Sequence, residues 1–319
     1  MAELKQLARR IFHETISAID IPEAMQRKLR REGTVLHLEG ARVDLSGFTS
    51  IRVIGMGKAA HRMVEGFAIL LGGSVPFEGI VSAPTAPLRA VEGMQYFVGG
   101  HPTPDEQSWK AGEAIVASLR KCDEKTIVFF LLSGGGSALV ELPLDARQTL
   151  EDVRQLHRAL VTCGASIEAM NTIRKHVSAV KGGRLAAAAG RATKITLAVS
   201  DVPVGKESAL ASGPTLPDPT TIADVQRVIA EFSLGEKLPP ALLRWLNEGK
   251  MPETPKGDHE AFRNAHFSLL LGLDDLFHPA HHATEAKGFL ACCDNTTDDW
   301  PVEKAADYLL EQLDRKSVV

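Results

Sequence analysis

Two glycine-rich segments hold the residue types best suited to binding a phosphate. The first, residues 55–60 (GMGKAA), fits the pattern G-x-G-x-x-A between a strand-like apolar run and a helical one. Gly55 and Gly57 would let backbone amides approach an anion at a helix N-terminus, and Lys58 adds a point charge. A tight turn with an exposed lysine has the same sequence, so the pattern leaves both interpretations open.

The second segment, residues 133–137 (SGGGS), follows the most continuous apolar run of the chain. Three consecutive glycines lose much backbone entropy on folding, and their natural use is a concave nest of amides for phosphate. A serine nucleophile is a competing interpretation, but the pattern G-x-S-x-G is absent. A plain loop is the remaining alternative.

Polar and basic residues recur at helical spacing further along the chain. A helix predicted over residues 166–189 would place them on one face, although such a face can also be ordinary solvated surface. They are Asn171, Arg174, Lys175 and Lys181, followed by Arg184 after a glycine pair.

Asp201 ends the run 196–201 (TLAVSD), and its carboxylate could bind Mg²⁺, accept a hydroxyl proton or cap a helix. Anion-binding amides, cations and a carboxylate are the equipment of phosphoryl transfer, because that chemistry depends mostly on positioning and charge stabilisation. Together these residues indicate a site that handles phosphate.

The histidines give weaker signals. His101 stands at the end of a strand-like run beside a proline turn, where Asp105 is suited to cap a helix, and it could face the same site. His278, His281 and His282 lack the H-E-x-x-H spacing, so they predict the start of a helix and no protein-bound metal.

The elements that position these residues follow from apolar periodicity. Near-continuous apolar runs that alternate with helical segments are typical of a mainly parallel α/β sheet with helices on both faces. Strands are predicted at residues 51–55, 79–83, 95–99, 126–132, 196–201, 266–272 and 288–293. Helices are predicted at residues 1–30, 58–71, 146–163, 166–189, 221–233 and 301–316, with a hairpin at 34–45 and an exposed loop at 251–260.

Composition narrows the class of protein. The chain has 319 residues, 44% hydrophobic and 24% charged, which excludes a disordered chain, a collagen-like repeat and a small disulfide scaffold. A net charge of −4 gives no overall field for nucleic acid, and no window of about 18–20 residues is apolar enough to span a bilayer. Four cysteines without C-x-x-C spacing, and an N-terminus charged throughout, predict reduced thiols and a cytoplasmic protein.

Five segments carry a resemblance to a known family. In order along residues 1–315 they are VIGMGKAA, GGHPTPDEQS, LLSGGGSALVELP, EAMNTIRKHVSAVKGGRLA, and SDVPVG followed by ASGPTLPDPTT. They resemble the glycerate 2-kinases of the bacterial and animal type, whose genes are often labelled hydroxypyruvate reductase. The resemblance implies phosphorylation of D-glycerate to 2-phosphoglycerate with ATP and Mg²⁺, by a Rossmann-like three-layer αβα domain.

The resemblance also implies roles for individual residues. Lys58 matches the lysine thought to act in catalysis, and Asp201 is assigned to catalysis with it. The residues assigned to the substrate or nucleotide are Gly55, Gly57, Ser133, Gly134, Gly135, Gly136, Ser137, Asn171, Arg174 and Lys175.

One departure from the family concerns length. Family members continue into a second, C-terminal domain with another glycine-rich segment and an arginine, and no such segment follows residue 300 here. The expected organisation is a helical and hairpin extension over residues 1–50 and a Rossmann-like domain over 51–319, with the second domain not present. This leaves open whether the chain is active by itself, and whether it is a homo-oligomer.

Two other functions remain as alternatives. The pattern G-x-G-x-x-A would suit an NAD(P)-dependent hydroxypyruvate reductase, but the acidic residue at the right distance, Glu78, precedes the next strand instead of ending it. A domain that binds glycerate or nucleotide without turnover is the third hypothesis.

Overall fold

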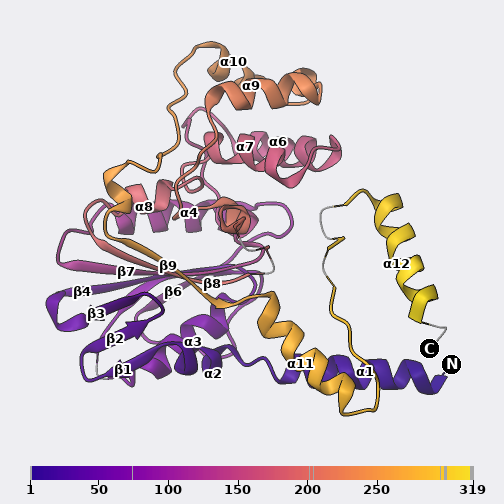
Figure 1. Ribbon diagram of the computed structural model, residues 1–319. Coiled ribbons are helices and arrows are strands. Elements are labelled where there is room, and N and C mark those ends of the chain that lie inside the picture. The colour runs from indigo at the N-terminus through magenta and orange to yellow at the C-terminus, as the bar shows by residue number, and fades with distance from the viewer. Residues whose placement is uncertain are drawn as a thin grey trace. The chain divides into compact units, whose positions relative to one another are not determined.

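Six parallel strands form the central sheet of the computed structural model (Figure 1). The structure describes residues 2–73, 75–200, 202–203, 205–294, 296–297 and 300–316. The strands are β4 (Ser50–Met56), β5 (Glu78–Ala83), β6 (Met94–Val98), β7 (Thr126–Ser133), β8 (Thr193–Val199) and β9 (Ala265–Leu271). All eight residues of β7 are buried, which explains why its sequence is apolar almost throughout.

The strand order decides where a ligand can bind. The sheet runs β6-β5-β4-β7-β8-β9, which is the order 3-2-1-4-5-6 of doubly wound dinucleotide-binding sheets. The winding reverses between β4 and β7, so the carboxyl ends of these two strands frame the crevice in which such sheets bind ligands. The predicted Rossmann-like fold is confirmed.

Helices cover both faces of this sheet. On one face α3 (Ala60–Leu71) packs with α2 (Ile21–Lys28) (Figure 1). Phe67 of α3 contacts Phe129 of β7, with ring centroids 4.6 Å apart and the rings tilted by 50°. On the other face lie α4 (Glu106–Leu119), α5 (Gly136–Leu139) and α8 (Arg184–Ala188). Apolar residues of α4 and α8 share one core with the side chains of β4 and β7 that point to that face.

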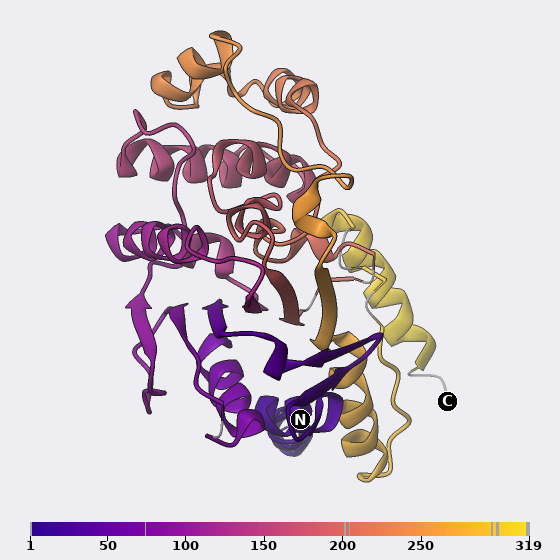
Figure 2. The ribbon, with the colours of Figure 1, turned by 90° about the vertical axis from the view of Figure 1, so that its left-hand side faces the viewer.

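A further helical layer lies beyond α4 and α8 (Figures 1 and 2). It has its own apolar core, which includes Leu160, Ile173, Val225 and Trp245, and the predicted three-layer sandwich did not contain it. Its helices are α6 (Leu150–Thr162), α7 (Ile167–Val177), α9 (Ile222–Glu231) and α10 (Pro240–Asn247). Helices α6 and α7 belong to the long connection between β7 and β8, and α9 and α10 to the one between β8 and β9. The second connection also holds the short 3₁₀ helices η2 (Glu207–Ser212), η3 (Leu234–Glu236) and η4 (Glu260–Phe262).

The N-terminal part differs in detail from the prediction. The first 30 residues form two helices, α1 (Ala2–Ser17) and α2, because Asp20 caps α2 and Pro22 stands in its first turn. The predicted hairpin is confirmed as part of a small antiparallel sheet that precedes the 3₁₀ helix η1 (Leu45–Gly47). Its strands are β1 (Arg30–Glu32), β2 (Val35–Leu38) and β3 (Ala41–Asp44).

The chain divides into two compact units, residues 20–273 and residues 1–19 with 274–319. The smaller unit contains α1, most of α11 (Leu273–Glu285) and α12 (Val302–Lys316). Residues 288–293 form neither helix nor strand, so the strand predicted there is wrong. In the described ranges no helix has the length and apolar character needed to cross a membrane.

Two other predictions concern loops and cysteines. The loop at 251–260 is present but is not exposed throughout, since the side chains of Met251 and Thr254 are buried. The four cysteines form no disulfide, as expected for reduced thiols.

Candidate active site

The two glycine-rich segments lie against each other at the carboxyl ends of β4 and β7. The Lys58 amide donates a 2.9 Å hydrogen bond to the Gly134 carbonyl, and the Ala59 amide donates one of 2.9 Å to Ser133 Oγ. Gly57 has a φ of +125°, and a Cβ there would lie 2.2 Å from Ser133 Oγ. Only glycine fits this approach, so the contact between the two loops depends on it.

Gly55 lies within strand β4, whereas Gly57 lies in the loop that follows it. A Cβ added to Gly55 would come 3.3 Å from Val64 of α3 and 3.4 Å from Val81 of β5. Its small size therefore lets α3 pack closely on the strand, and the residue itself is buried.

A lysine and a histidine flank the second glycine loop. Gly135 has a φ of +86°, and a Cβ there would lie 3.1 Å from His101 Cδ2 and 3.3 Å from Lys58 Cγ. Lys58 is exposed, and its ammonium group has no partner among the described residues. Partial desolvation and the positive charge of Lys58 both lower the pKa of His101, which favours the neutral form of its imidazole.

A chain of side chains joins the glycine loop to α7. Ser137 and Ser212 share a 2.9 Å hydrogen bond, and Ser212 donates one of 3.0 Å to Asn171 Oδ1. Arg174 Nη1 lies 3.5 Å from the same oxygen. The sequence did not single out Ser212, which stands two residues before Pro214 in the segment ASGPTLPDPTT.

The backbone around Ser212 is strained. Ala211 and Ser212 adopt left-handed conformations with φ of +50° and +61°, which cost roughly 1 kcal/mol each for residues other than glycine. A Cβ on Gly136 would lie 2.9 Å from the Ala211 Cβ, so the strained turn packs directly against the glycine loop. Such strain is concentrated at functional sites in proteins.

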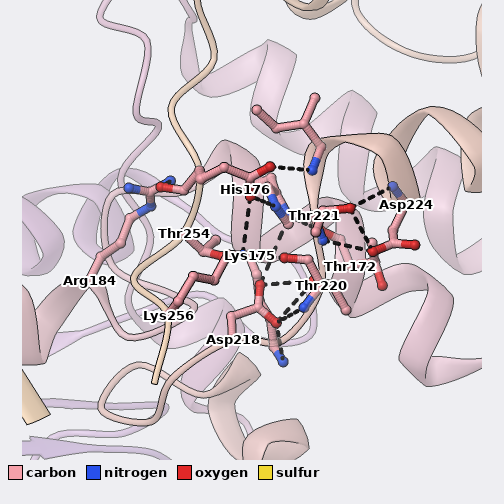
Figure 3. Close-up of polar contacts among 12 residues, drawn as sticks. Thr172, Lys175, His176, Arg184, Asp218, Thr220, Thr221, Asp224, Thr254 and Lys256 are labelled. Atoms are coloured by element: carbon pink, nitrogen blue, oxygen red, sulfur yellow. Dashed lines mark hydrogen bonds and ion pairs between the residues drawn. The ribbon is translucent and has the colours of Figure 1, made fainter. Parts of the chain in front are cut away.

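The buried side chain of Lys175 belongs to a polar network that reaches the surface at Glu253 (Figure 3). It is 5% exposed, and its Nζ lies 3.4 Å from Asp218 Oδ1. The neighbouring His176 lies 3.3 Å from Glu253 through Nε2, and Glu253 Oε1 accepts a 2.9 Å bond from the Ile222 amide. These contacts fix α7 to the segments that precede α9 and follow α10.

The prediction that Lys181 shares a helix face with the other basic residues is wrong. Helix α7 ends at Val177, where Ser178 is already extended (φ −103°, ψ 140°). Gly182 and Gly183 then take left-handed conformations before α8 begins, so the predicted helix over 166–189 is interrupted. Lys181 lies in the connecting segment and makes a buried 2.5 Å ion pair with Glu141.

Two arginines near these elements keep unused hydrogen-bonding capacity. The Nε groups of Arg174 and Arg184 are buried without a partner among the described residues. Burial lowers the pKa of both, and because the pKa of Arg184 is still about 10, that side chain is charged at neutral pH. Arg184 donates to the Pro252 carbonyl at 3.2 Å and lines a cavity of about 440 Å³.

Asp201 lies outside the described residues. Within the part of the chain that the structure covers, no three His, Cys, Asp or Glu side chains converge to hold a metal ion. His278, His281 and His282 lie in α11, where His281 is 3.3 Å from Glu285.

Comparison with known proteins assigns the chain to a family. A family model described as domain of unknown function (DUF4147) matches residues 7–247. The D-glycerate 2-kinase of Thermotoga maritima is 31% identical over 308 residues, which cover 96% of this chain and 67% of that protein. The chain belongs to the glycerate kinase family.

Other glycerate kinase relatives agree in sequence and fold. The glycerate 2-kinase of Pyrococcus horikoshii is 32% identical over 84% of this chain and 59% of its own length. The crystal structure of the Thermotoga maritima glycerate kinase superposes with a TM-score of 0.71 at 30% identity, covering 91% of this chain and 64% of that one. The chain thus spans about three fifths to two thirds of these relatives, and the resemblance inferred from the five motifs is confirmed.

Proposed function

We propose that this chain acts as a glycerate 2-kinase, transferring the γ-phosphoryl group of ATP to the 2-hydroxyl of D-glycerate. The ammonium group of Lys58, which lies beside the glycine loop that follows β7 and has no partner in the described part of the chain, carries this proposal. A fixed cation next to free amides stabilises the charge of a phosphoryl group in transfer without needing to reorganise. The relatives from Pyrococcus horikoshii and Thermotoga maritima, both named glycerate 2-kinases, support the same activity.

The two glycine segments contribute different groups to this site. The amides of Lys58 and Ala59 are already bonded to the other loop, so the first segment offers the Lys58 side chain. In the second segment, Gly136 and Ser137 begin α5, and their amides have neither an intrahelical acceptor nor another described partner. We assign phosphate binding to residues 134–137 and charge stabilisation to Lys58.

Substrate binding is assigned to the polar chain on α7. The Nε of Arg174 has no partner among the described residues, and its guanidinium group suits a carboxylate or phosphate, while Asn171 Oδ1 orients it. The predicted binding role of Lys175 stays a prediction, and it requires the ammonium group to give up Asp218.

The residues at the switch point of the sheet fit the phosphates of ATP, since the amides of Gly136 and Ser137 have no partner among the described residues and Lys58 lies beside the same loop. Mg²⁺ is bound in such sites through one or two carboxylates and the phosphates of the substrate, and when bound it neutralises phosphate charge. Asp201 is the residue proposed to hold it, two positions after β8 ends at Val199.

An assay of ADP release tests this function. The chain is incubated with MgATP and D-glycerate, and ³¹P NMR distinguishes 2-phosphoglycerate from 3-phosphoglycerate. The expected result is ADP release that depends on D-glycerate, with 2-phosphoglycerate as the product. ADP release no faster than in a control without glycerate would contradict the proposal. Binding of glycerate or ATP without turnover would favour the ligand-binding alternative.

The structure counts against the nicotinamide alternative. Glu78 is the first residue of β5 and pairs with Arg52 at 2.7 Å, at the amino end of the sheet and away from the glycine loops. The residue that ends β5 is Ala83, which cannot accept hydrogen bonds from a ribose through its side chain. Oxidation of NADH or NADPH by the chain with hydroxypyruvate would reverse this conclusion.

Three predictions about the whole protein remain proposals. They are a domain boundary near residue 50, a cytoplasmic location and a homo-oligomeric state.

A further inference from the structure

An imidazole without a hydrogen-bond partner lies beside Lys58. The missing Cβ of Gly135 would lie 3.2 Å from His101 Nε2 and 3.3 Å from Lys58 Cγ. Because one point is within contact distance of both, the imidazole and the lysine side chain flank the same glycine. Neither ring nitrogen of His101 makes a hydrogen bond to a described residue, and the side chain is exposed.

The backbone that carries His101 is firmly held although the ring is exposed. Gly99 donates a 3.0 Å hydrogen bond to the Ala83 carbonyl, and Gly100 donates one of 3.0 Å to Ser108 Oγ. Ser108 and Asp105 form the capping box of α4, so the turn after β6 is fixed to the first turn of that helix. The imidazole is therefore presented at a defined place, free to contact a ligand.

The charges around His101 favour its neutral form. Lys58 is the one described charged group that acts on it, and together with burial it lowers the pKa of the ring. Asp105, on the same turn, is engaged in capping α4. A neutral imidazole at physiological pH can accept a proton, whereas the other histidine near this edge, His61, already contacts the Thr85 carbonyl at 2.7 Å.

We propose that His101 is the general base that takes the proton from the hydroxyl group of the substrate. This rests on the proposed kinase function and adds a catalytic residue to it. The hydroxyl oxygen forms a bond to the γ-phosphorus, and the bond from that phosphorus to the β,γ-bridging oxygen breaks. ADP leaves with the electron pair, and the proton passes to a ring nitrogen of His101. Lys58 stabilises the phosphoryl group in transfer, which assigns different tasks to the two neighbours.

The test compares His101→Gln, which keeps hydrogen bonding but loses basicity, with His101→Ala and with His278→Gln, an exposed histidine of α11. For His101→Gln we expect kcat to fall by about 10²-fold to 10⁴-fold, the usual contribution of general acid–base catalysis, while KM changes little. The acidic limb of the wild-type pH profile should disappear. Added imidazole should restore part of the activity of His101→Ala, and His278→Gln should match the wild type.

The outcomes separate this proposal from the kinase function. If the wild type makes no phosphoglycerate, both fail. If the wild type is active and His101→Gln keeps its kcat and pH profile, the base assignment alone is overturned. A raised KM with unchanged kcat also overturns it, because His101 would then only bind the substrate. The base assignment is also overturned if His101→Ala loses kcat and imidazole does not restore it, although the variant still binds ATP and unfolds like the wild type.

Discussion

Lys58 differs from most basic residues around the sheet in having no described partner. Lys175, Lys181 and Arg52 are each paired with a carboxylate. A paired cation offers a ligand little, because binding must first break an existing interaction. An ammonium group beside a glycine loop with no partner among the described residues can interact fully with an incoming phosphate, which is why we propose a catalytic role for Lys58.

Replacing this lysine tests its role directly. Lys58→Ala should lower kcat/KM for D-glycerate by about two orders of magnitude or more, the scale of losing one group that stabilises the transition state. Lys110→Ala, on an exposed i,i+4 pair with Glu106, serves as the control and should leave kcat/KM unchanged. Near wild-type kinetics for Lys58→Ala would remove this residue from the catalytic assignment.

At the scale of elements, the site depends on how closely the loops after β4 and β7 approach each other. Their contact passes through Gly57, where any side chain meets both Ser133 Oγ and the Ser133 backbone. Helix α7 is held from another direction by Asp218, whose carboxylate accepts hydrogen bonds from the Lys175 ammonium group and the Thr220 hydroxyl. Two kinds of contact therefore set the geometry, one steric and one electrostatic.

One alanine substitution in each of the two loops tests whether the steric contact at Gly57 stabilises the fold. Gly57→Ala should destabilise the fold by about 1–3 kcal/mol, because the position has a φ of +125° and no room for a Cβ. Gly134→Ala is the matched control, since nothing lies within 4 Å of an added Cβ there, and its stability should stay equal or rise slightly. Urea unfolding measures both, and equal midpoints would contradict the packing described.

Removing the carboxylate beside α7 tests the electrostatic contact. Asp218→Ala should lower the free energy of unfolding by about 3–5 kcal/mol, because it leaves the buried Lys175 ammonium group without its partner. Asp258→Ala, at an exposed aspartate, should stay within about 0.5 kcal/mol of the wild type. A small effect at Asp218 in urea unfolding would mean that Lys175 is compensated elsewhere.

At the scale of the whole molecule, one buried carboxylate joins the apolar core between the sheet and α4 to the core of the outer helical layer. Glu141 follows α5 on the sheet side, and it contacts His157 of α6 at 3.4 Å and Lys181 at 2.5 Å. Ser178 donates a further 2.6 Å bond to it. Burial by itself would raise the pKa of Glu141, but Lys181 and His157 outweigh it and hold the pKa at about 2.

This shift predicts how stability depends on acidity. The pKa of Glu141 is about 2 in the folded chain against an ordinary 4.5, so the unfolded state binds the proton more readily. Its contribution, on the order of 3 kcal/mol, is fully present above pH 4.5 and is lost as the pH falls from there toward 2. Glu141→Gln should be less stable than the wild type at pH 7, and its free energy of unfolding should change less with pH across this interval.

Urea unfolding at a series of pH values measures this effect. Glu92→Gln, at an exposed glutamate, is the control and should follow the wild-type curve. An unchanged slope below pH 4.5 in Glu141→Gln would show that other carboxylates govern acid unfolding.

Local patterns in the sequence determined most of the strands, the glycine turns and the family. Apolar runs and glycine pairs are properties of neighbouring residues, and parallel strands bring their carboxyl ends to one edge, so Lys58 and residues 133–137 could be expected at one site. The separate helical layer could not be expected in the same way, because its helices come from two connections that meet only in space.

Only the tertiary structure decided which basic groups are free. Lys58, Lys175 and Lys181 look alike as letters in a sequence, yet Lys175 and Lys181 are buried against Asp218 and Glu141, 43 and 40 residues away in the chain. Ser212 and His101 join the site through contacts with loops from other strands. Periodicity reports which face of an element is buried, whereas the pairing of buried charges depends on which distant segments the packing brings together.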